Sequence, residues 1–143
     1  GPDIYDPANK TITLLDGYLK PMLNGKGLAG AAIPVGKIAG PVLLLSGTDD
    51  KIWPSSLFAA RIMTRLEKHR RPYADASLCY RGAGHYVAMW PYRPTLTTGF
   101  AAGPMSIVMG GNQIAYAYAE SDAWPRILAF LHKAMNQEVP RHD

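Results

Sequence analysis

The hydrophobic positions of this chain form three runs that predict a strand, a helix and a second strand. Residues 41–45 are continuously apolar and lie between Gly40 and Gly47. A short run without alternation predicts a buried parallel strand, because helices cover such strands on both faces. Residues 55–70 carry apolar side chains at helical spacing, and residues 76–80 predict another short strand. Together they predict a right-handed βαβ unit of an α/β fold.

Polar side chains follow both predicted strands. Asp49 and Asp50 end the turn Gly47-Thr48-Asp49-Asp50 after the first strand, and His85 ends the turn Gly82-Ala83-Gly84-His85 after the second. The carboxyl ends of parallel strands meet at one edge of a sheet, where open α/β folds keep their ligands and their chemistry. We therefore expect an acid and an imidazole to be neighbours at this edge.

The residues around these two turns resemble a known family. Residues 47–56, with Gly82-Ala83-Gly84-His85 completed 35 residues after Asp50, are similar to the last third of the α/β hydrolases. More narrowly, they resemble the C-terminal domain shared by acyl-CoA thioesterases and bile acid-CoA:amino acid N-acyltransferases. The pattern continues in residues 32–38, Pro91-Tyr92-Arg93-Pro94, Gly110-Gly111 and Ala123-Trp124. The resemblance extends over about residues 31–135.

This resemblance implies catalytic roles for Asp50 and His85. The family places its acid at the fourth position of Gly-x-x-Asp, which is Asp50, whereas Asp49 would belong to the turn. In acyl transfer, His85 would act as the general base and Asp50 would fix its tautomer and orientation. We therefore predict a separation of about 2.6 to 3.2 Å between an Asp50 carboxylate oxygen and His85 Nδ1.

The nucleophile of such a triad is missing from the sequence. No Gly-x-Ser-x-Gly string, nor its cysteine form, occurs in the chain, although triad order in this fold is nucleophile, acid, histidine. The expected fold class is therefore α/β, the C-terminal part of an α/β-hydrolase fold with parallel strands flanked by helices, incomplete without an upstream half. We expect an extended arm or linker over residues 1–30, the hydrolase segment with acid and histidine over 31–137, and a tail over 138–143.

Two classes of function stay open. The first is the C-terminal portion of an acyl-CoA thioester hydrolase or acyltransferase, inactive alone and acting on an acyl-CoA or related thioester or ester. It would be completed by a second polypeptide that carries the nucleophile elbow, or it would self-associate. The second is a non-catalytic α/β-hydrolase-like interaction module. A fragment of a dienelactone-hydrolase-like esterase is a further alternative, which Trp53-Pro54 and Gly110-Gly111 disfavour.

Composition and charge narrow the list of partners. The 143 residues are 48% hydrophobic and 18% charged, which suits one globular core. The net charge of +4 is dispersed except for Lys68-His69-Arg70-Arg71, and a cationic helix C-terminus explains that run better than a contact with CoA phosphates or nucleic acid. No nucleic-acid-binding signature and no membrane-spanning segment is present in the sequence. We expect no cofactor, no metal site and a cytoplasmic location.

Some expectations concern single side chains. Ser55 or Ser56 follows a turn and precedes a helix, so either hydroxyl is expected to cap that helix. Cys79 lies inside a predicted strand, where we expect a small core residue.

The last third of the chain gives weaker patterns. Residues 86–109 contain several prolines and glycines and predict a long irregular region, whose aromatic residues either line an acyl tunnel or pin the loop. A final helix is predicted over residues 119–137. Pro125 lies in its first turn if the helix begins near Ser121, and otherwise marks a kink.

Overall fold

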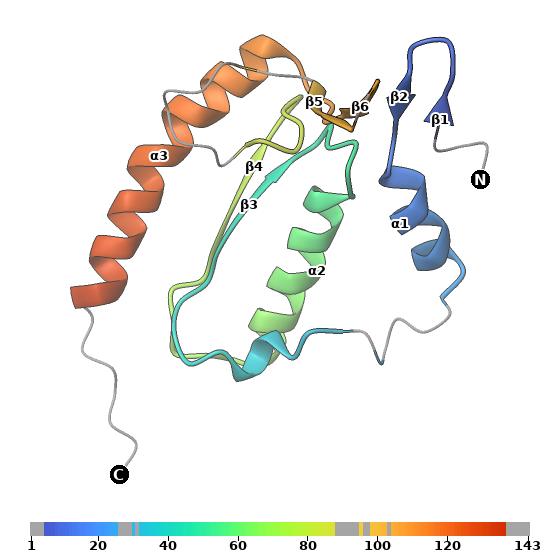
Figure 1. The fold of residues 1–143 in the computed structure, drawn as a ribbon. Coiled ribbons are helices and arrows are strands. Elements are labelled where there is room, and N and C mark those ends of the chain that lie inside the picture. Colours follow the sequence, from blue (N-terminus) through green and yellow to red (C-terminus); the bar gives the residue numbers. More distant parts are fainter. Residues whose placement is uncertain are drawn as a thin grey trace.

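A computed structural model of the chain describes residues 5–25, 30, 32–87, 95, 98–102 and 104–136 (Figure 1). The N-terminal elements are β1 Tyr5–Asp6, β2 Thr11–Ile12, α1 Leu15–Leu23 and the short 3-10 helix η1 Val35–Lys37. The central elements are β3 Leu43–Gly47, α2 Ser55–Lys68 and β4 Ala76–Tyr80. The C-terminal elements are β5 Thr98–Ala102, β6 Met105–Val108 and α3 Gln113–Asn136.

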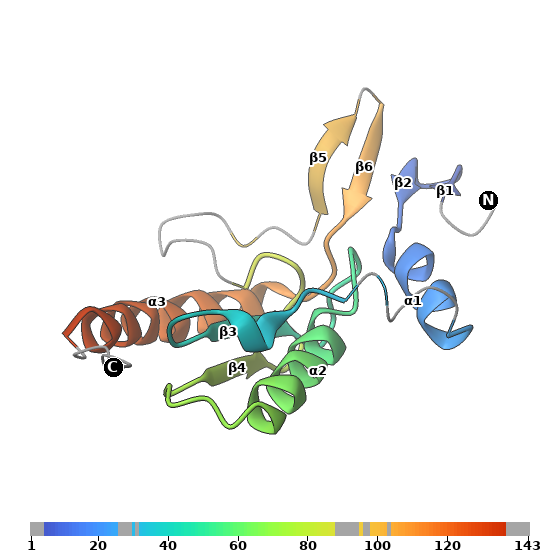
Figure 2. The same cartoon turned by 90° about the horizontal axis from the view of Figure 1, so that it is seen from below.

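The centre of the fold is the predicted βαβ unit. β3 and β4 pair in parallel, with a register that runs from Leu43 opposite Ala76 to Gly47 opposite Tyr80. The connecting helix α2 packs on both strands, and α3 lies on the opposite side of the strand pair (Figures 1 and 2). Cover from two helices explains why the sequence of β3 does not alternate between apolar and polar residues. The predicted strand, helix and strand are found, although the first strand runs over Leu43–Gly47 instead of residues 41–45 and its leucines are only partly buried.

A second sheet has four short strands in the order β1-β2-β6-β5. β5 and β6 form an antiparallel hairpin with an irregularity between Gly99 and Ala101, and β6 pairs in parallel with β2. The expectation of an irregular region over residues 86–109 is therefore wrong for these strands. Their signal in the sequence is weak, because they are short and because β2 lies almost a hundred residues before β6. Of the aromatic residues assigned to a tunnel or a loop anchor, Trp90 and Tyr92 lie outside the described residues.

The N-terminal region also differs from expectation. Residues 1–30 were expected to form an extended arm or linker, yet α1 occupies Leu15–Leu23. Gly17 and Pro21, both poor helix formers, conceal this helix in the sequence. The Leu15 N–H donates to the Lys51 carbonyl oxygen at 3.0 Å, so α1 is joined to the acid-bearing turn.

Helix α3 begins six residues earlier than predicted, at Gln113 instead of residue 119. Asn112 sets this start, because its side-chain oxygen accepts the Ala115 N–H at 2.9 Å in the manner of an N-cap. Pro125 lies inside the helix and not in its first turn. No helix in the described part of the chain has both the length and the apolarity to cross a membrane.

Two single-residue expectations are wrong. Cys79 is exposed, since it lies one position before the buried Tyr80 in β4 and successive strand residues point to opposite faces. Neither Ser55 nor Ser56 caps α2. The Ser55 hydroxyl instead donates to the Gly47 carbonyl oxygen at 3.2 Å and accepts the Gly47 N–H at 3.3 Å, which ties the start of α2 to the end of β3.

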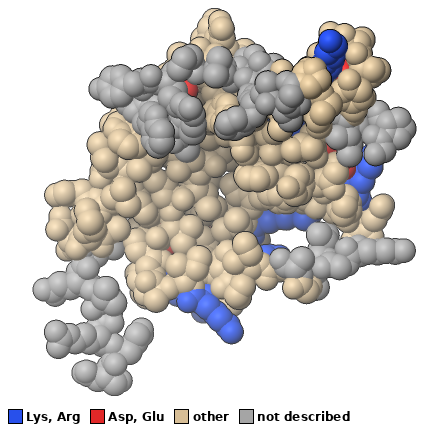
Figure 3. All heavy atoms as spheres, viewed as in Figure 1, with Lys and Arg blue, Asp and Glu red and all other residues tan. Residues whose placement is uncertain are grey.

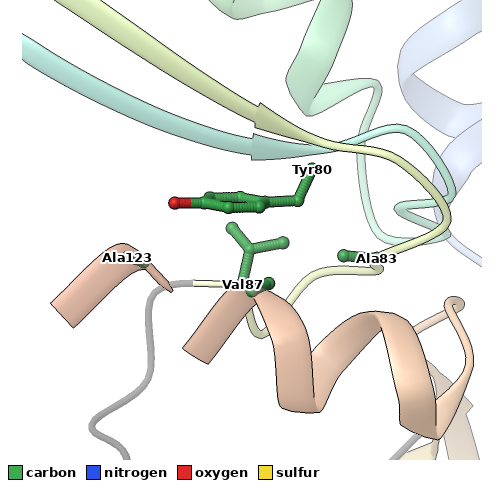
Figure 4. Packing of buried hydrophobic residues seen from close by; sticks show 5 residues of the cluster. Tyr80, Ala83, Val87 and Ala123 are labelled. Atoms are coloured by element: carbon green, nitrogen blue, oxygen red, sulfur yellow. The ribbon is translucent and has the colours of Figure 1, made fainter. Parts of the chain in front are cut away.

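The main core joins β4 and the turn after it to α3. Its buried members are Tyr80, Ala83, Val87, Ala119 and Ala123 (Figure 4). The alanines let the turn approach α3 closely, and the Tyr80 hydroxyl donates to Asp122 Oδ2 at 3.0 Å. Burial and this hydrogen bond raise the pKa of Tyr80 to about 12. The Tyr80 hydroxyl therefore stays protonated across the physiological pH range and continues to donate its hydrogen bond to Asp122.

The hydrogen bond between Tyr80 and Asp122 predicts that loss of the Tyr80 hydroxyl lowers the stability of the fold. Replacing Tyr80 by Phe removes the hydroxyl donor to Asp122 and should lower the free energy of unfolding by about 1 kcal/mol. Tyr118→Phe is the matched control, because Tyr118 packs edge-on against Tyr80 but is 63% exposed. Urea denaturation of both variants should show a loss only for Tyr80→Phe. Equal losses in the two variants would contradict a stabilising hydrogen bond between Tyr80 and Asp122.

Candidate active site

The candidate site forms where three turns meet: the turn after β3, the turn after β4 and the turn that precedes α3. The Asp49 N–H donates to the Ala83 carbonyl oxygen at 2.9 Å, which joins the first turn to the second. The Met109 carbonyl oxygen accepts N–H groups from His85 at 3.0 Å and from Lys51 at 3.3 Å. A single carbonyl group of the third turn therefore binds backbone N–H groups of both other turns.

Glycines allow these turns to come so close. At Gly47, an added Cβ would lie 2.2 Å from the Ala83 carbonyl oxygen. At Gly110, φ is +77° and an added Cβ would lie 1.9 Å from the Asp49 carbonyl oxygen. Only glycine combines that backbone angle with so close an approach. The two glycines therefore set the spacing of the turns that carry Asp50 and His85.

Asp50 and His85 are in contact. Asp50 is buried, and its Oδ2 lies 3.1 Å from His85 Nδ1. Its other oxygen, Oδ1, accepts the N–H groups of Ile52 at 2.9 Å and Trp53 at 3.2 Å. The predicted separation is thus confirmed, and the carboxylate is held from both ends.

The surroundings of Asp50 favour its charged form. Burial alone would raise the pKa of the Asp50 carboxyl, but hydrogen bonds from His85 and from the Ile52 N–H together lower it below its ordinary value of 3.8. A carboxylate at neutral pH only accepts hydrogen bonds, so Nδ1 of His85 must be the donor. The proton on Nδ1 leaves Nε2 as the nitrogen that exchanges protons when the ring is neutral.

Asp49 contacts the turns and not His85. Its Oδ2 accepts the Gly111 N–H at 3.0 Å, and its Oδ1 forms an ion pair with Lys51 Nζ at 2.7 Å. Both contacts lie within the turns, and neither involves His85. The contacts agree with the assignment of Asp49 to the turn.

The imidazole of His85 keeps part of its surface exposed. Its side chain is 23% exposed, and no further hydrogen bond to the ring is made within the described part of the chain. The indole of Trp53 meets it edge-on, with ring centroids 4.6 Å apart. Sequence reasoning did not identify this contact. The available signal is that Trp53 follows Asp50 by three residues, which lets its N–H bind the same carboxylate.

No nucleophile partner of His85 is found among the residues that the structure describes. The Ser46 hydroxyl is buried and makes no hydrogen bond with them, and the hydroxyl of Ser55 binds Gly47. The same residues include no group of three or more His, Cys, Asp or Glu side chains able to hold a metal ion. The described site is thus an acid–imidazole pair.

Comparisons with known proteins give the family of the chain. The family described as BAAT / Acyl-CoA thioester hydrolase C terminal matches residues 9–137. The chain is 32% identical over 126 residues to acyl-coenzyme A thioesterase 1 of Mus musculus, an alignment that covers 87% of the chain and 29% of that protein.

Two further relatives come from the same organism. The chain is 34% identical over 110 residues to the peroxisomal succinyl-coenzyme A thioesterase, covering 76% of the chain and 26% of the relative. It is 32% identical over 121 residues to acyl-coenzyme A amino acid N-acyltransferase 2, covering 84% of the chain and 27% of the relative. The chain spans less than a third of the length of each of these curated relatives.

The close approach at Gly110 predicts a large effect of one methyl group. Gly110→Ala should lower the free energy of unfolding by about 2 kcal/mol or more, because it adds backbone strain and a clash with the Asp49 carbonyl. Gly25→Ala is the control, since Gly25 has a similar φ of +66° but nothing within 4 Å of its added Cβ. Urea denaturation should give a much smaller loss for Gly25→Ala. Equal losses in the two variants would show that the close approach of Gly110 to the Asp49 carbonyl does not contribute to the effect.

The lowered pKa of Asp50 predicts a pH dependence of stability. Its contribution is complete above the unfolded-state value and is lost as the pH falls through the lower folded-state value. The stability difference between the parent chain and Asp50→Asn should therefore shrink between about pH 5 and pH 2. Urea titrations across this range measure it. A difference that stays constant with pH would contradict a charged Asp50 held by His85.

Proposed function

Because the chain belongs to the BAAT / acyl-CoA thioester hydrolase C-terminal family, we propose that it supplies the base and the orienting acid for acyl transfer from a thioester. The observation that carries this proposal is the 3.1 Å contact between Asp50 Oδ2 and His85 Nδ1. The buried acid holds the ring through Nδ1, while the ring itself stays partly exposed. An imidazole held in this way suits proton transfer at Nε2.

The proposed mechanism uses His85 twice. Nε2 first accepts the proton of a serine hydroxyl or cysteine thiol while that oxygen or sulfur attacks the thioester carbonyl carbon. The resulting imidazolium is stabilised by the Asp50 carboxylate. It then returns the proton to the CoA sulfur as the carbon–sulfur bond breaks. Water or an amine finally releases the acyl group: His85 takes the proton of the incoming group and returns it to the serine oxygen or cysteine sulfur as the bond from that atom to the acyl carbon breaks.

We place the nucleophile in a second polypeptide segment that completes the α/β-hydrolase fold. The parallel sheet of β3 and β4 has only two strands among the described residues. Parallel strands are normally buried within larger sheets, and two strands alone are marginally stable. This supports either a partner segment beside them or self-association of the chain.

The substrate is proposed from the relatives, whose names specify acyl-CoA and succinyl-CoA thioesters for hydrolysis and an amino acid as an acyl acceptor. We therefore propose an acyl-CoA thioester for this chain, with water or an amine as the final acceptor. One relative is named as peroxisomal. The cytoplasmic location expected from the sequence stays a prediction.

Activity assays test the roles of the pair. The purified chain alone should not hydrolyse a panel of acyl-CoA thioesters, whereas its assembly with a chain that carries the nucleophile should. In the assembly, His85→Ala should reduce kcat on the order of a millionfold and Asp50→Asn about ten-thousandfold. His132→Ala is the matched control, because His132 is exposed on α3 and, among the described residues, contacts only the Asn136 side-chain amide.

The outcomes separate the function classes. An assembly whose turnover does not depend on His85 would overturn the proposed mechanism and leave the chain as an interaction module. Turnover by the isolated chain would instead reveal a nucleophile within it, with Ser46, Cys79 and Ser106 the first residues to replace.

A further inference from the structure

A cavity of about 490 Å³ lies between α1, the segment before η1, and α2. Its apolar lining includes Met22 from α1, Ile33 and Val35 from the segment that enters η1, and Phe58 and Ile62 from α2. A volume of several hundred cubic ångströms with a mostly apolar lining is typical of sites for small molecules. Phe58 and Ile62 belong to the apolar side chains that recur at helical spacing along α2, yet both are only partly buried.

The cavity is connected to His85 through two aromatic side chains. Tyr18 lines the cavity and meets Trp53 edge-on at 6.1 Å between ring centroids. Trp53 in turn meets the imidazole of His85 at 4.6 Å. A chain bound in the cavity would therefore leave it beside Tyr18 and Trp53, close to the imidazole.

Positively charged side chains also line the cavity. Arg61 and Arg65 line the wall from α2 and make no ion pair with described residues. Arginine side chains commonly cover an apolar wall with their stems and keep their charged heads at the rim. Figure 3 shows positive side chains at the gap between α1 and α2. Arg65 lies about 10 Å further along α2 than Phe58, at 1.5 Å per helical residue.

We propose that this cavity receives the acyl chain of the thioester, with its carbonyl end toward Trp53 and its far end toward Arg65. The apolar lining favours a hydrocarbon chain over the polar CoA moiety. Because Arg61 and Arg65 make no ion pair within the described part of the chain, they favour a bound chain that ends in a carboxylate over one that ends in a methyl group. This inference rests on the proposed function only for the placement of the carbonyl beside His85.

Filling the cavity tests the site. S-decylpantetheine is an uncharged thioether that cannot be hydrolysed, and the full chain should bind it in a calorimetric titration. Ile62→Trp fills the cavity and should weaken binding at least about tenfold. Leu57→Trp is the control, because Leu57 lies on the same helix, is 40% exposed and is not part of the lining. No binding by the parent chain, or equal binding by Ile62→Trp, would overturn the proposal.

A second pair of variants changes exposed residues, so that a loss of binding cannot be attributed to misfolding. Ile33 lines the cavity and is 71% exposed, whereas Ile114 on α3 is 84% exposed and lies elsewhere. Ile33→Asp should weaken binding and Ile114→Asp should not. His85→Ala should bind the probe like the parent chain, since binding requires no proton transfer. A failure of binding therefore counts against the cavity, and a failure of turnover counts against the proposed function.

The direction of the chain is tested with a second probe, S-(9-carboxynonyl)pantetheine, which has the same length but ends in a carboxylate. It should bind about two- to fivefold more tightly than S-decylpantetheine, the size expected for an exposed ion pair. Arg65→Gln should remove this advantage. Lys68→Gln, the same loss of charge one turn further along α2 and outside the lining, should keep it. Equal affinity of the parent chain for both probes would overturn the assigned direction.

Discussion

The candidate site depends on how the Asp50 carboxylate is held. Its Oδ1 accepts two backbone N–H groups from its own turn, and its Oδ2 lies 3.1 Å from His85 Nδ1. Because Asp50 is buried, an unpaired charge there would be costly, and the hydrogen bonds offset that cost. The same bonds that keep the acid charged thus also fix the orientation of the imidazole. The contact between Asp50 and His85 therefore contributes both to the stability of the fold and to the proposed chemistry.

The rest of the fold serves to bring two turns to one edge. The parallel pairing of β3 and β4 places both turns at the same end of the sheet, and the Met109 carbonyl joins them through Lys51 and His85. Gly110 lets this third segment approach the Asp49 carbonyl. Helix α3 follows that segment directly and is tied to β4 through Tyr80 and Asp122. Residues distant in sequence therefore set the geometry of the acid–imidazole pair.

The sequence was informative where local pattern and tertiary structure agree. The apolar run of β3 and the turn residues after β3 and β4 predicted both the βαβ unit and the proximity of Asp50 and His85. Prediction failed where distant partners decide the outcome. The strand β6 depends on pairing with β2, the helix α1 contains Gly17 and Pro21, and the Ser55 hydroxyl binds Gly47 instead of capping its own helix. The edge contact between Trp53 and His85 could not be read from spacing alone.

The central claim is that Asp50 holds His85 with the proton on Nδ1 and leaves Nε2 for proton transfer. Nitrogen-15 NMR of the histidine side chains distinguishes the two neutral tautomers of the ring directly. With His85 assigned through His85→Ala, the account predicts a protonated Nδ1 and a bare Nε2 when the ring is neutral, with the proton on Nδ1 no longer fixed in Asp50→Ala. A neutral His85 that carries its proton on Nε2 in the parent chain would contradict the account.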